Sequence, residues 1–356
     1  MTLEVDRSIS IPPYQQIVRQ LRERITHEEM NEDDHIPSAR EIVQITGVSL
    51  ATAQRVLNEL KNEGLIYSLP GKGSFISPRK EGIPEAIHIF LPSTRLSFFM
   101  EILNGVYDAL SSMKIDLKLH SLNTDKLVWD WKTIEELEDV VKSRGGVIFI
   151  EEAFDSVRTA CLRAARQIPF VTVEWQLDGA CAIVNDYEDS TASVVSYLCS
   201  DKHCSSLLVL KGRDFQYNAS LKLAGIKKGA EAAGLRENRD LFFLDTDFDA
   251  YSGYESVTAY LKDHEAPQAI FCANDYEAIG VIGALTEQGL LTGRDVQLVG
   301  YGDMTDKTTL YFPLTTVKQN LEEMGRQAVK MLLLKAKGED VPPQKIVATE
   351  LIVRKT

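Results

Sequence analysis

Apolar residues in the first part of the chain recur at the spacing of helices that bury one face. The first row consists of Tyr14, Ile17, Leu21 and Ile25. A later row, in the stretch ITGVSLATAQRVLNEL, consists of Ala53, Val56, Leu57 and Leu60. Between them, a shorter row turns Ile42 and Ile45 inward and stops at Gly47. The pattern therefore predicts three helices, each with one apolar face.

Polar residues mark where the second and third of these helices begin. Ser38 and Glu41 have the spacing of a capping box, in which the hydroxyl caps the helix and the carboxylate reaches back to the cap. Ser49 is a good N-cap for the third helix. Because only a short glycine-containing turn separates the two helices, they predict a helix-turn-helix unit.

Two short β-rich runs follow the third helix, in the stretch NEGLIYSLPGKGSFIS. The turn between them consists of Pro70, Gly71, Lys72 and Gly73. A hairpin after a helix-turn-helix unit is a wing. We expect a winged helix-turn-helix domain over residues 1–78 and a polar, proline-bearing linker over residues 79–86.

From residue 87 onward, short apolar runs alternate with longer amphipathic helices. The strand-like runs include IHIFL, GVIFI, PFVTV and QAIFCA. This alternation predicts an α/β fold with mostly parallel sheets flanked by helices, and roughly ten strands imply two sheets. Ligands of such folds bind beyond the carboxyl ends of the strands, so we expect a ligand in a cleft between two lobes.

Composition is that of an ordinary globular protein with more than one domain. The chain has 356 residues, of which 44% are hydrophobic and 26% charged. No apolar run approaches the roughly 18 residues of a membrane span. The start MTLEVDRSISIPPYQQ lacks the pattern of a signal peptide, and the five cysteines form no CxxC pair. We therefore expect a cytoplasmic protein without a membrane partner, a metal or another cofactor.

Charge is distributed unevenly along the chain. The net charge of −13 argues against general adhesion to nucleic acid. Between residues 35 and 80, however, six basic residues face only three acidic ones. This part of the chain can therefore approach phosphates while the remainder is repelled, which favours a local binding surface.

Over residues 12–77 the sequence resembles the GntR family of winged-helix repressors. The resemblance is carried by PPYQQIVRQLRERI, IPSAREIVQITGVSLATAQRVLNELKNEGLIY and PGKGSFIS. It implies that the third helix enters the major groove and reads base edges with its N-terminal residues. The candidate DNA-binding residues are Ser38, Arg40, Ser49, Leu50, Thr52, Gln54, Arg55, Gly71 and Lys72.

Two of these positions depart from the family pattern. Where the family has arginines, this chain has Leu50 and Gln54. An arginine pairs with guanine, whereas glutamine suits adenine and leucine suits the methyl group of thymine. We therefore expect an operator richer in A·T at these positions. A buried contact with the neighbouring helix is the alternative for Leu50. For Arg55, a phosphate contact and a surface salt bridge both stay open.

Nearly all of residues 87–356 look like the effector domain of lac-repressor-type regulators, which share the fold of type I periplasmic sugar-binding proteins. The motifs include STRLSFFMEILNGVYDAL, SLKLAGIKKGAEAAGL, AIFCANDYEAIGVIGAL and FPLTTVKQNLEEMGRQAVKMLL. A GntR-type head on such a domain is similar to the arabinose repressor arrangement. The family wiring implies one lobe of about 87–184 plus 317–342, and another of about 185–316 plus a C-terminal strand within 343–356.

The resemblance also implies which residues face the effector. They are Phe98, Phe99, Glu174, Asp186, Lys222, Asn274, Asp275 and Asp303. Carboxylates and amides bind sugar hydroxyls, and phenylalanine rings pack on the C–H face of a sugar. Lys222 replaces a family arginine and lacks its planar fork. The alternatives are core positions for the phenylalanines, a helix-surface position for Lys222 and a helix cap for Asp275. For Trp175, the cleft and a subunit interface both stay open.

Together these features predict a sequence-specific DNA-binding transcriptional regulator. We expect a homodimer on a pseudo-palindromic operator, acting as a repressor of carbohydrate-utilisation genes that a small sugar releases from DNA. The alternatives are a ligand-activated regulator and a sugar-binding or sugar-processing protein without a repressor role. The chain has no GxSxG, no HExxH and no GxGxxG that opens a helix after a strand. We therefore expect no enzyme and assign no catalytic residue.

Overall fold

The chain divides into two compact units. The structure is a computed structural model that describes residues 3–6, 11–26, 34–62, 65–69, 72–76, 84–94, 97–121, 129, 131–212, 217–303 and 313–356. The first unit consists mainly of the residues up to Ile83, and the second mainly of those from Pro84 to the C-terminus. Among the described residues, the first contains helices and one small sheet, and the second contains two larger sheets.

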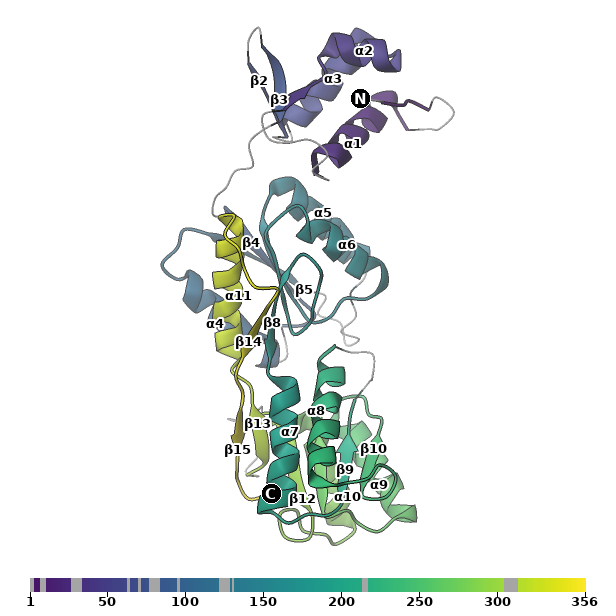
Figure 1. The fold of residues 1–356 in the computed structure, drawn as a ribbon, viewed down its shortest axis with the longest axis vertical. Helices are drawn as coiled ribbons and strands as arrows, with labels where there is room; N and C mark the ends of the chain where they lie inside the picture. The colour runs from purple at the N-terminus through teal and green to yellow at the C-terminus, as the bar shows by residue number, and fades with distance from the viewer. Residues whose placement is uncertain are drawn as a thin grey trace. The chain divides into compact units, whose positions relative to one another are not determined.

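The first unit is a winged helix-turn-helix fold. Its elements are α1 (Pro13–Thr26), β1 (His35–Ile36), α2 (Ala39–Thr46), α3 (Leu50–Asn62), β2 (Ile66–Leu69) and β3 (Gly73–Ile76). β3 pairs antiparallel with both β1 and β2, and α1 and α2 both pack against α3 (Figure 1). The fold class predicted for this part of the chain is confirmed.

The core of the first unit is built on the apolar row of α3. The buried residues of this row are Ala53, Val56, Leu57 and Leu60, as predicted. On α2, Ile42 is fully buried, but Ile45 is 40% exposed, so its predicted inward position is wrong. α2 ends at Thr46, and Gly47 takes the left-handed conformation (φ 68°) that turns the chain toward α3. Helical spacing identifies an apolar face but not how far the neighbouring helices cover it.

Ser38 begins α2 as the capping box predicts. Its Oγ accepts the amide of Glu41 at 3.3 Å, and Oε2 of Glu41 accepts the amide of Ser38 at 2.7 Å. These hydrogen bonds lower the pKa of the Glu41 carboxyl. The start of the helix therefore depends on one reciprocal pair of side chains.

Removing this cap with Ser38→Ala is expected to weaken α2 by about 1 kcal/mol, because an amide of its first turn loses its acceptor. Hydrogen exchange of the α2 amides in the full chain then accelerates about fivefold. The exposed Gln44 lies in the same helix, and Gln44→Ala is the matched control, which leaves exchange unchanged. Equal exchange in Ser38→Ala and the wild type would contradict the role of the cap.

In the part of the second unit that the structure describes, two six-stranded sheets form two lobes. The lobe 1 sheet has the order β14-β8-β7-β6-β4-β5, with all pairs parallel. Its strands are β4 (Ala86–Leu91), β5 (Asp116–Ser121), β6 (Gly146–Ile150), β7 (Phe170–Val173), β8 (Cys181–Asn185) and β14 (Gln344–Val347). The lobe 2 sheet has the order β10-β9-β11-β12-β13-β15, and only β13 and β15 pair antiparallel. Its strands are β9 (Leu207–Leu210), β10 (Leu241–Leu244), β11 (Ala269–Cys272), β12 (Gln297–Gly302), β13 (Thr315–Lys318) and β15 (Glu350–Ile352).

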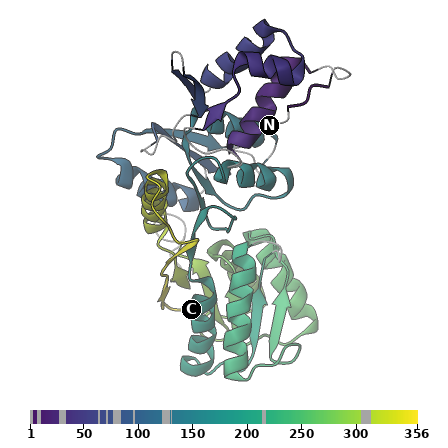
Figure 2. The ribbon, with the colours of Figure 1, turned by 45° about the horizontal axis from the view of Figure 1, so that its top comes forward.

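Helices connect and cover these strands, which confirms the predicted α/β class. Those of lobe 1 are α4 (Ser97–Leu110), α5 (Trp131–Ser143), α6 (Asp155–Ala165) and α11 (Leu321–Ala336). Those of lobe 2 are α7 (Tyr187–Ser196), continued by a π-helical turn (Tyr197–Asp201), α8 (Tyr217–Ala233), α9 (Ala250–Asp263) and α10 (Asp275–Glu287). α4 lies beside α11, and α7 beside α8 (Figures 1 and 2). Both pairs approach closely at glycine: a Cβ on Gly105 would lie 1.9 Å from the carbonyl oxygen of Glu322. Within the described residues, no helix is both long and apolar enough to cross a membrane.

The chain passes between the two lobes after β8, between β13 and α11, and between β14 and β15. The predicted boundaries at 317 and 343 are therefore wrong by a few residues. β13 continues to Lys318 in lobe 2, and β14 belongs to lobe 1 although residues 343–356 are predicted to lie in lobe 2. Only residues 348 and 349 separate β14 from β15. Because this separation is so short, the sequence pattern predicts one C-terminal strand. The structure has two, and they belong to different sheets.

Candidate functional site

The first two turns of α3 expose Leu50 and Gln54 to solvent. Leu50 is 57% exposed, so the alternative of a buried Leu50 is wrong, and Gln54 is also exposed. Ser49 caps the helix, because its Oγ accepts the amide of Thr52 at 3.1 Å. The hydroxyls of Ser49 and Thr52 lie 2.8 Å apart. Thr52 is thus held at the cap, while Leu50 and Gln54 are available to contact base edges.

Arg55 is exposed on the same helix and is held by Tyr14 of α1. Its Cζ lies 3.8 Å from the centroid of the Tyr14 ring, and its Nη2 donates to the Tyr14 hydroxyl at 3.0 Å. Among the described residues, the guanidinium contacts this ring and not a carboxylate. Of the two alternatives open for Arg55, the surface salt bridge has no support in this part of the chain.

The remaining candidates for DNA contact lie on α2 and the wing. The hydroxyl of Ser38 is engaged in the α2 cap, and Arg40 is exposed in the first turn of that helix. Lys72 is exposed in the hairpin turn, where its amide donates to the carbonyl of Leu69 at 3.0 Å. Gly71 lies outside the described residues.

In the second unit, polar side chains gather where the strands of lobe 1 end. Glu151 follows β6, Glu174 follows β7, and Asn185 ends β8. The carboxyl ends of adjacent parallel strands lie at one edge of a sheet, so these side chains share that edge. From lobe 2, Lys222 of α8 and Tyr301 of β12 belong to the same group. We call these five residues and Asp275 the interlobe cluster.

Glu174 is 2% exposed and accepts three hydrogen bonds. Its carboxylate accepts from Nδ2 of Asn185 at 3.0 Å, from Nδ2 of Asn218 at 3.4 Å and from the hydroxyl of Tyr187. Burial, and then the nearby Glu151 carboxylate, raise the pKa of Glu174 to about 8. Burial also raises the pKa of Glu151 to about 7. Both carboxyls therefore retain a proton at a higher pH than a surface glutamate does.

The ammonium group of Lys222 lies near aromatic rings and carboxylates. Its Nζ donates to the carbonyl of Ala273 at 2.9 Å and lies 4.1 Å from the ring centroid of Tyr301 and 5.3 Å from that of Tyr187. Burial lowers the pKa of Lys222 to about 8, while nearby carboxylates, of which Glu174 is the strongest, act to raise it. The alternative of a helix-surface lysine is therefore wrong.

Asp275 and Asn274 are neighbours with different roles. Asp275 is 1% exposed, its Oδ1 accepts the Thr316 hydroxyl at 2.6 Å, and its charge acts on Lys222. Asn274 is the N-cap of α10: its Oδ1 accepts the amide of Glu277 at 2.9 Å, and its Nδ2 donates to a backbone carbonyl at 2.8 Å. The helix cap is thus Asn274 and not Asp275. Each end of the Asn274 amide makes one hydrogen bond within the protein, and its expected contact with the effector stays a prediction.

Asp186 and Asp303 are engaged elsewhere in the chain. Oδ1 of Asp186 accepts the amide of Thr349 at 3.0 Å, which ties together two of the segments that pass between the lobes. Asp303 forms an ion pair with Arg354 at 2.7 Å. Both carboxylates thus hold chain segments in place, and their expected contact with the effector stays a prediction.

The aromatic candidates belong largely to the core of lobe 1. Phe99 is 3% exposed within that core, so its predicted contact with a sugar is wrong. Phe98 is partly buried and packs on the same core, with its ring centroid 5.2 Å from that of Phe99. Trp175 is fully buried and donates its Nε1 to the carbonyl of Phe149 at 3.1 Å, so it lines neither the cleft nor an interface. An aromatic residue at the start of a helix or after a strand looks the same in sequence whether a core or a cleft covers it.

Three members of the interlobe cluster, Glu151, Asn185 and Tyr301, and the adjacent Tyr187 were not among the candidates identified from the sequence. Glu151 could have been predicted from the sequence, because it follows an apolar, strand-like run as Glu174 does. Tyr187 and Tyr301 are each 1% exposed and cannot be distinguished by sequence from core residues. Their hydroxyls are nevertheless hydrogen-bonded: Gln319 donates to Tyr187 at 3.3 Å, and the Tyr301 hydroxyl lies 3.1 Å from that of Ser190.

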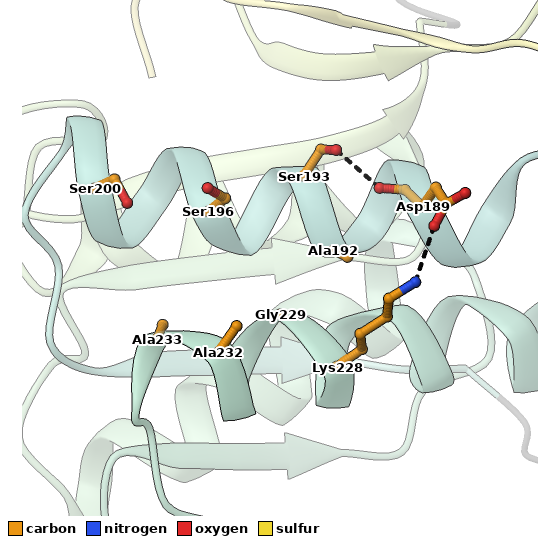
Figure 3. Close-up of a pocket in the computed structure, with 9 residues that line it drawn as sticks. All are labelled: Asp189, Ala192, Ser193, Ser196, Ser200, Lys228, Gly229, Ala232 and Ala233. Atoms are coloured by element: carbon orange, nitrogen blue, oxygen red, sulfur yellow. Dashed lines mark hydrogen bonds and ion pairs between the residues drawn. The ribbon is translucent and has the colours of Figure 1, made fainter.

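A shallow groove of about 490 Å³ lies between α7 and α8 (Figure 3). An exposed ion pair between Lys228 and Asp189, with 3.0 Å between Nζ and Oδ1, forms part of its lining. The other lining residues are Ala192, Ser193, Ser196, Ser200, Gly229, Ala232 and Ala233. Small side chains of this kind are typical of two closely packed helices, and we assign the groove no ligand.

Known regulators match both units of the chain. Residues 13–76 match the family model for bacterial regulatory proteins of the gntR family, and residues 195–356 match that for a periplasmic binding protein-like domain. The HTH-type transcriptional repressor PurR of Haemophilus influenzae (strain PittEE) is 25% identical over 333 residues, which cover 89% of this chain and 97% of PurR. The lactose operon repressor of Escherichia coli (strain K12) is 31% identical over 175 residues, or 49% of this chain and 48% of the repressor.

A solved complex of the transcriptional regulator CelR with cellobiose shares the fold. Its TM-score is 0.65 at 20% identity, and the match covers 86% of this chain and 91% of CelR. Two family matches, on the winged helix-turn-helix unit and on the two-lobed unit, thus agree with the architecture. The chain is a transcriptional regulator that joins a GntR-type DNA-binding domain to a periplasmic-binding-protein-like effector domain similar to those of lac- and PurR-type repressors.

Proposed function

We propose that this regulator is a repressor of carbohydrate-utilisation genes, which a small uncharged sugar bound at the interlobe cluster releases from DNA. The observation that carries the proposal is the position of Lys222 of lobe 2 among the carboxylates of Glu174 and Glu151 of lobe 1. A ligand that contacts these groups touches both lobes at once. Its binding is therefore linked to the arrangement of the lobes.

The chemistry of the interlobe cluster favours a polyol. Carboxylate oxygens accept hydrogen bonds from sugar hydroxyls, and the Lys222 ammonium donates them. Four carboxyl groups, those of Glu151, Glu174, Asp275 and Glu277, act on this one ammonium. A phosphorylated sugar would be repelled wherever these groups are ionised. The solved complex of CelR with cellobiose is consistent with a saccharide in a domain of this fold.

Release from DNA requires two states that the sugar distinguishes. A sugar shifts the equilibrium only if it binds the arrangement of low DNA affinity better than the arrangement of high affinity. We propose a homodimer, in which two DNA-binding domains contact the two halves of a pseudo-palindromic operator. A change between the lobes then alters the spacing or orientation of the two reading helices.

A thermal-shift screen of neutral monosaccharides and their phosphates tests the ligand class. A neutral sugar at about 100 times its Kd is expected to stabilise the protein by about 2.7 kcal/mol, which raises the midpoint of unfolding by several degrees. The phosphates of the same sugars should give no shift. In DNA-binding assays with an operator obtained by binding-site selection, the active sugar should weaken binding at least tenfold.

Two variants separate the interlobe cluster from the surface. Glu174→Gln should abolish both responses, whereas Glu188→Gln, at an exposed position on α7, should keep them. A sugar that tightens operator binding would show a ligand-activated regulator instead. A phosphosugar as the sole active compound, or no active sugar, would contradict the proposed ligand.

A further inference from the structure

The contact between Arg55 and Tyr14 joins the reading helix to α1. The guanidinium lies over the ring at 3.8 Å and also donates to the ring hydroxyl at 3.0 Å. The same hydroxyl accepts Nε2 of Gln15 at 3.1 Å, so the ring carries a second link within α1. An arginine side chain has several rotatable bonds, and two contacts of this kind favour one position over the others.

The charge of Arg55 is not neutralised within the described part of the protein. Glu59 lies four residues further along α3, at the spacing of a helical ion pair. The guanidinium nevertheless lies on Tyr14, and no described carboxylate forms an ion pair with it. Tyr14 therefore orients a full positive charge without cancelling it.

The place of Arg55 on α3 separates it from the base-reading residues. Leu50 and Gln54 belong to the first helical turns, which enter a groove most deeply in helix-turn-helix proteins. Arg55 projects toward α1 instead, and its Nη2 is engaged by Tyr14. A guanidinium held at one nitrogen is poorly suited to the two-pronged contact with guanine, but it still binds a phosphate oxygen.

We propose that Arg55 contacts a phosphate of the DNA backbone and that Tyr14 is the positioning residue that holds it there. This inference concerns DNA binding only and is independent of the effector. Two parts of the exposed surface of α3 then have different roles in DNA binding. Leu50 and Gln54 read bases, and Arg55 anchors the helix on the backbone.

The first test measures binding of the full chain to a mixed-sequence 30-base-pair duplex between 50 and 200 mM KCl. A phosphate contact contributes about 0.9 to the slope of log affinity against log salt. Arg55→Gln should reduce the slope by about this amount for each DNA-binding domain bound. It should also weaken binding to different sequences to a similar extent. Arg55→Lys keeps the charge and should retain the slope, at an affinity lowered several-fold.

The second test isolates the role of Tyr14 with a double-mutant cycle. Tyr14→Leu should weaken DNA binding several-fold in the wild type and have no further effect in the Arg55→Gln background. Tyr14→Phe keeps the ring and should have a smaller effect than Tyr14→Leu. As the matched control, Tyr14→Leu combined with Arg40→Gln should show additive effects. Circular dichroism of each variant reports whether the helices stay folded.

Three results would overturn the proposal. An unchanged salt slope in Arg55→Gln would exclude the phosphate contact. A change of sequence preference in place of a uniform loss would make Arg55 a base-reading residue. An equal effect of Tyr14→Leu with and without Arg55 would show that Tyr14 only supports the fold, to which it contributes as a partly buried residue against the core.

Discussion

Replacing Glu174 with glutamine is expected to stabilise residues 84–356 by about 2 kcal/mol at pH 8 and to leave their stability nearly unchanged at pH 5. The carboxyl is 2% exposed, and its pKa of about 8 lies well above the ordinary value of 4.5. At pH 8 the folded protein must therefore either hold a proton that the unfolded chain releases or bury a charge. A buried glutamine side chain is neutral, so it neither takes up a proton on folding nor buries a charge.

The direction of the pH dependence follows from the raised pKa. Between about pH 4.5 and pH 8 the folded state binds a proton at Glu174 that the unfolded state has released. The stability from this group is complete below the lower value and declines by up to about 1.4 kcal/mol per pH unit as the pH rises toward 8. Glu174→Gln removes this decline, and the loss of an acceptor for Tyr187 or Asn218 offsets the gain by about 1 kcal/mol.

Urea unfolding followed by tryptophan fluorescence measures this effect. All three tryptophans, Trp129, Trp131 and Trp175, lie in the second unit, so their signal reports on that unit in the full chain. Glu188→Gln, on the surface of α7, is the control and should change stability by less than about 0.5 kcal/mol. A difference between wild type and Glu174→Gln that is the same at pH 5 and pH 8 would refute the linkage.

Introducing both arginines that are typical of related DNA-binding heads, as Leu50→Arg and Gln54→Arg, is expected to change the sequence that the protein prefers. Both positions are exposed on the first turns of α3. A bidentate contact between arginine and guanine is worth about 1–3 kcal/mol of discrimination, or roughly 10- to 100-fold per base. The double variant should therefore select guanines where we expect the wild type to select adenine and thymine.

Binding-site selection with both proteins at one salt concentration checks this expectation. Asn58→Arg, exposed further along α3, adds charge beyond the first turns and is the matched control. It should tighten binding to all sequences without changing the preference. A wild-type half-site with guanine opposite Gln54 would refute our assignment of Leu50 and Gln54.

Local rules of helix and turn formation explain why the DNA-binding head was predictable. The cap at Ser38, the glycine at 47 and the apolar row of α3 act over a few residues, so sequence spacing identifies them. The position of Ile45 was not predictable, because its exposure depends on where α2 ends against the other helices. Likewise, the contact of Arg55 with Tyr14 spans 41 positions, and spacing within one helix does not indicate it.

The interlobe cluster was predictable only in part. Glu174, Lys222 and Asp275 were implied by the resemblance to lac-repressor-type effector domains, and the structure brings their charges together. Asp186, Asn274 and Asp303 occur in equally suitable motifs, yet each is engaged by backbone or by an ion pair. A motif predicts that a side chain lies near the other lobe. The hydrogen bonds and ion pairs of that side chain determine whether it is available to a ligand.

The sequence by itself determined the two kinds of domain, the α/β class and the position of the capped helix α3, because hydrophobic period, capping residues and strand–helix alternation are properties of neighbouring residues. Tertiary structure decided which side chains share a site. Glu151 and Tyr301 join Glu174 and Lys222, while Phe99 joins the core. These outcomes depend on which strands and helices meet. Burial and pKa values follow from such long-range contacts, which no local pattern in the chain specifies.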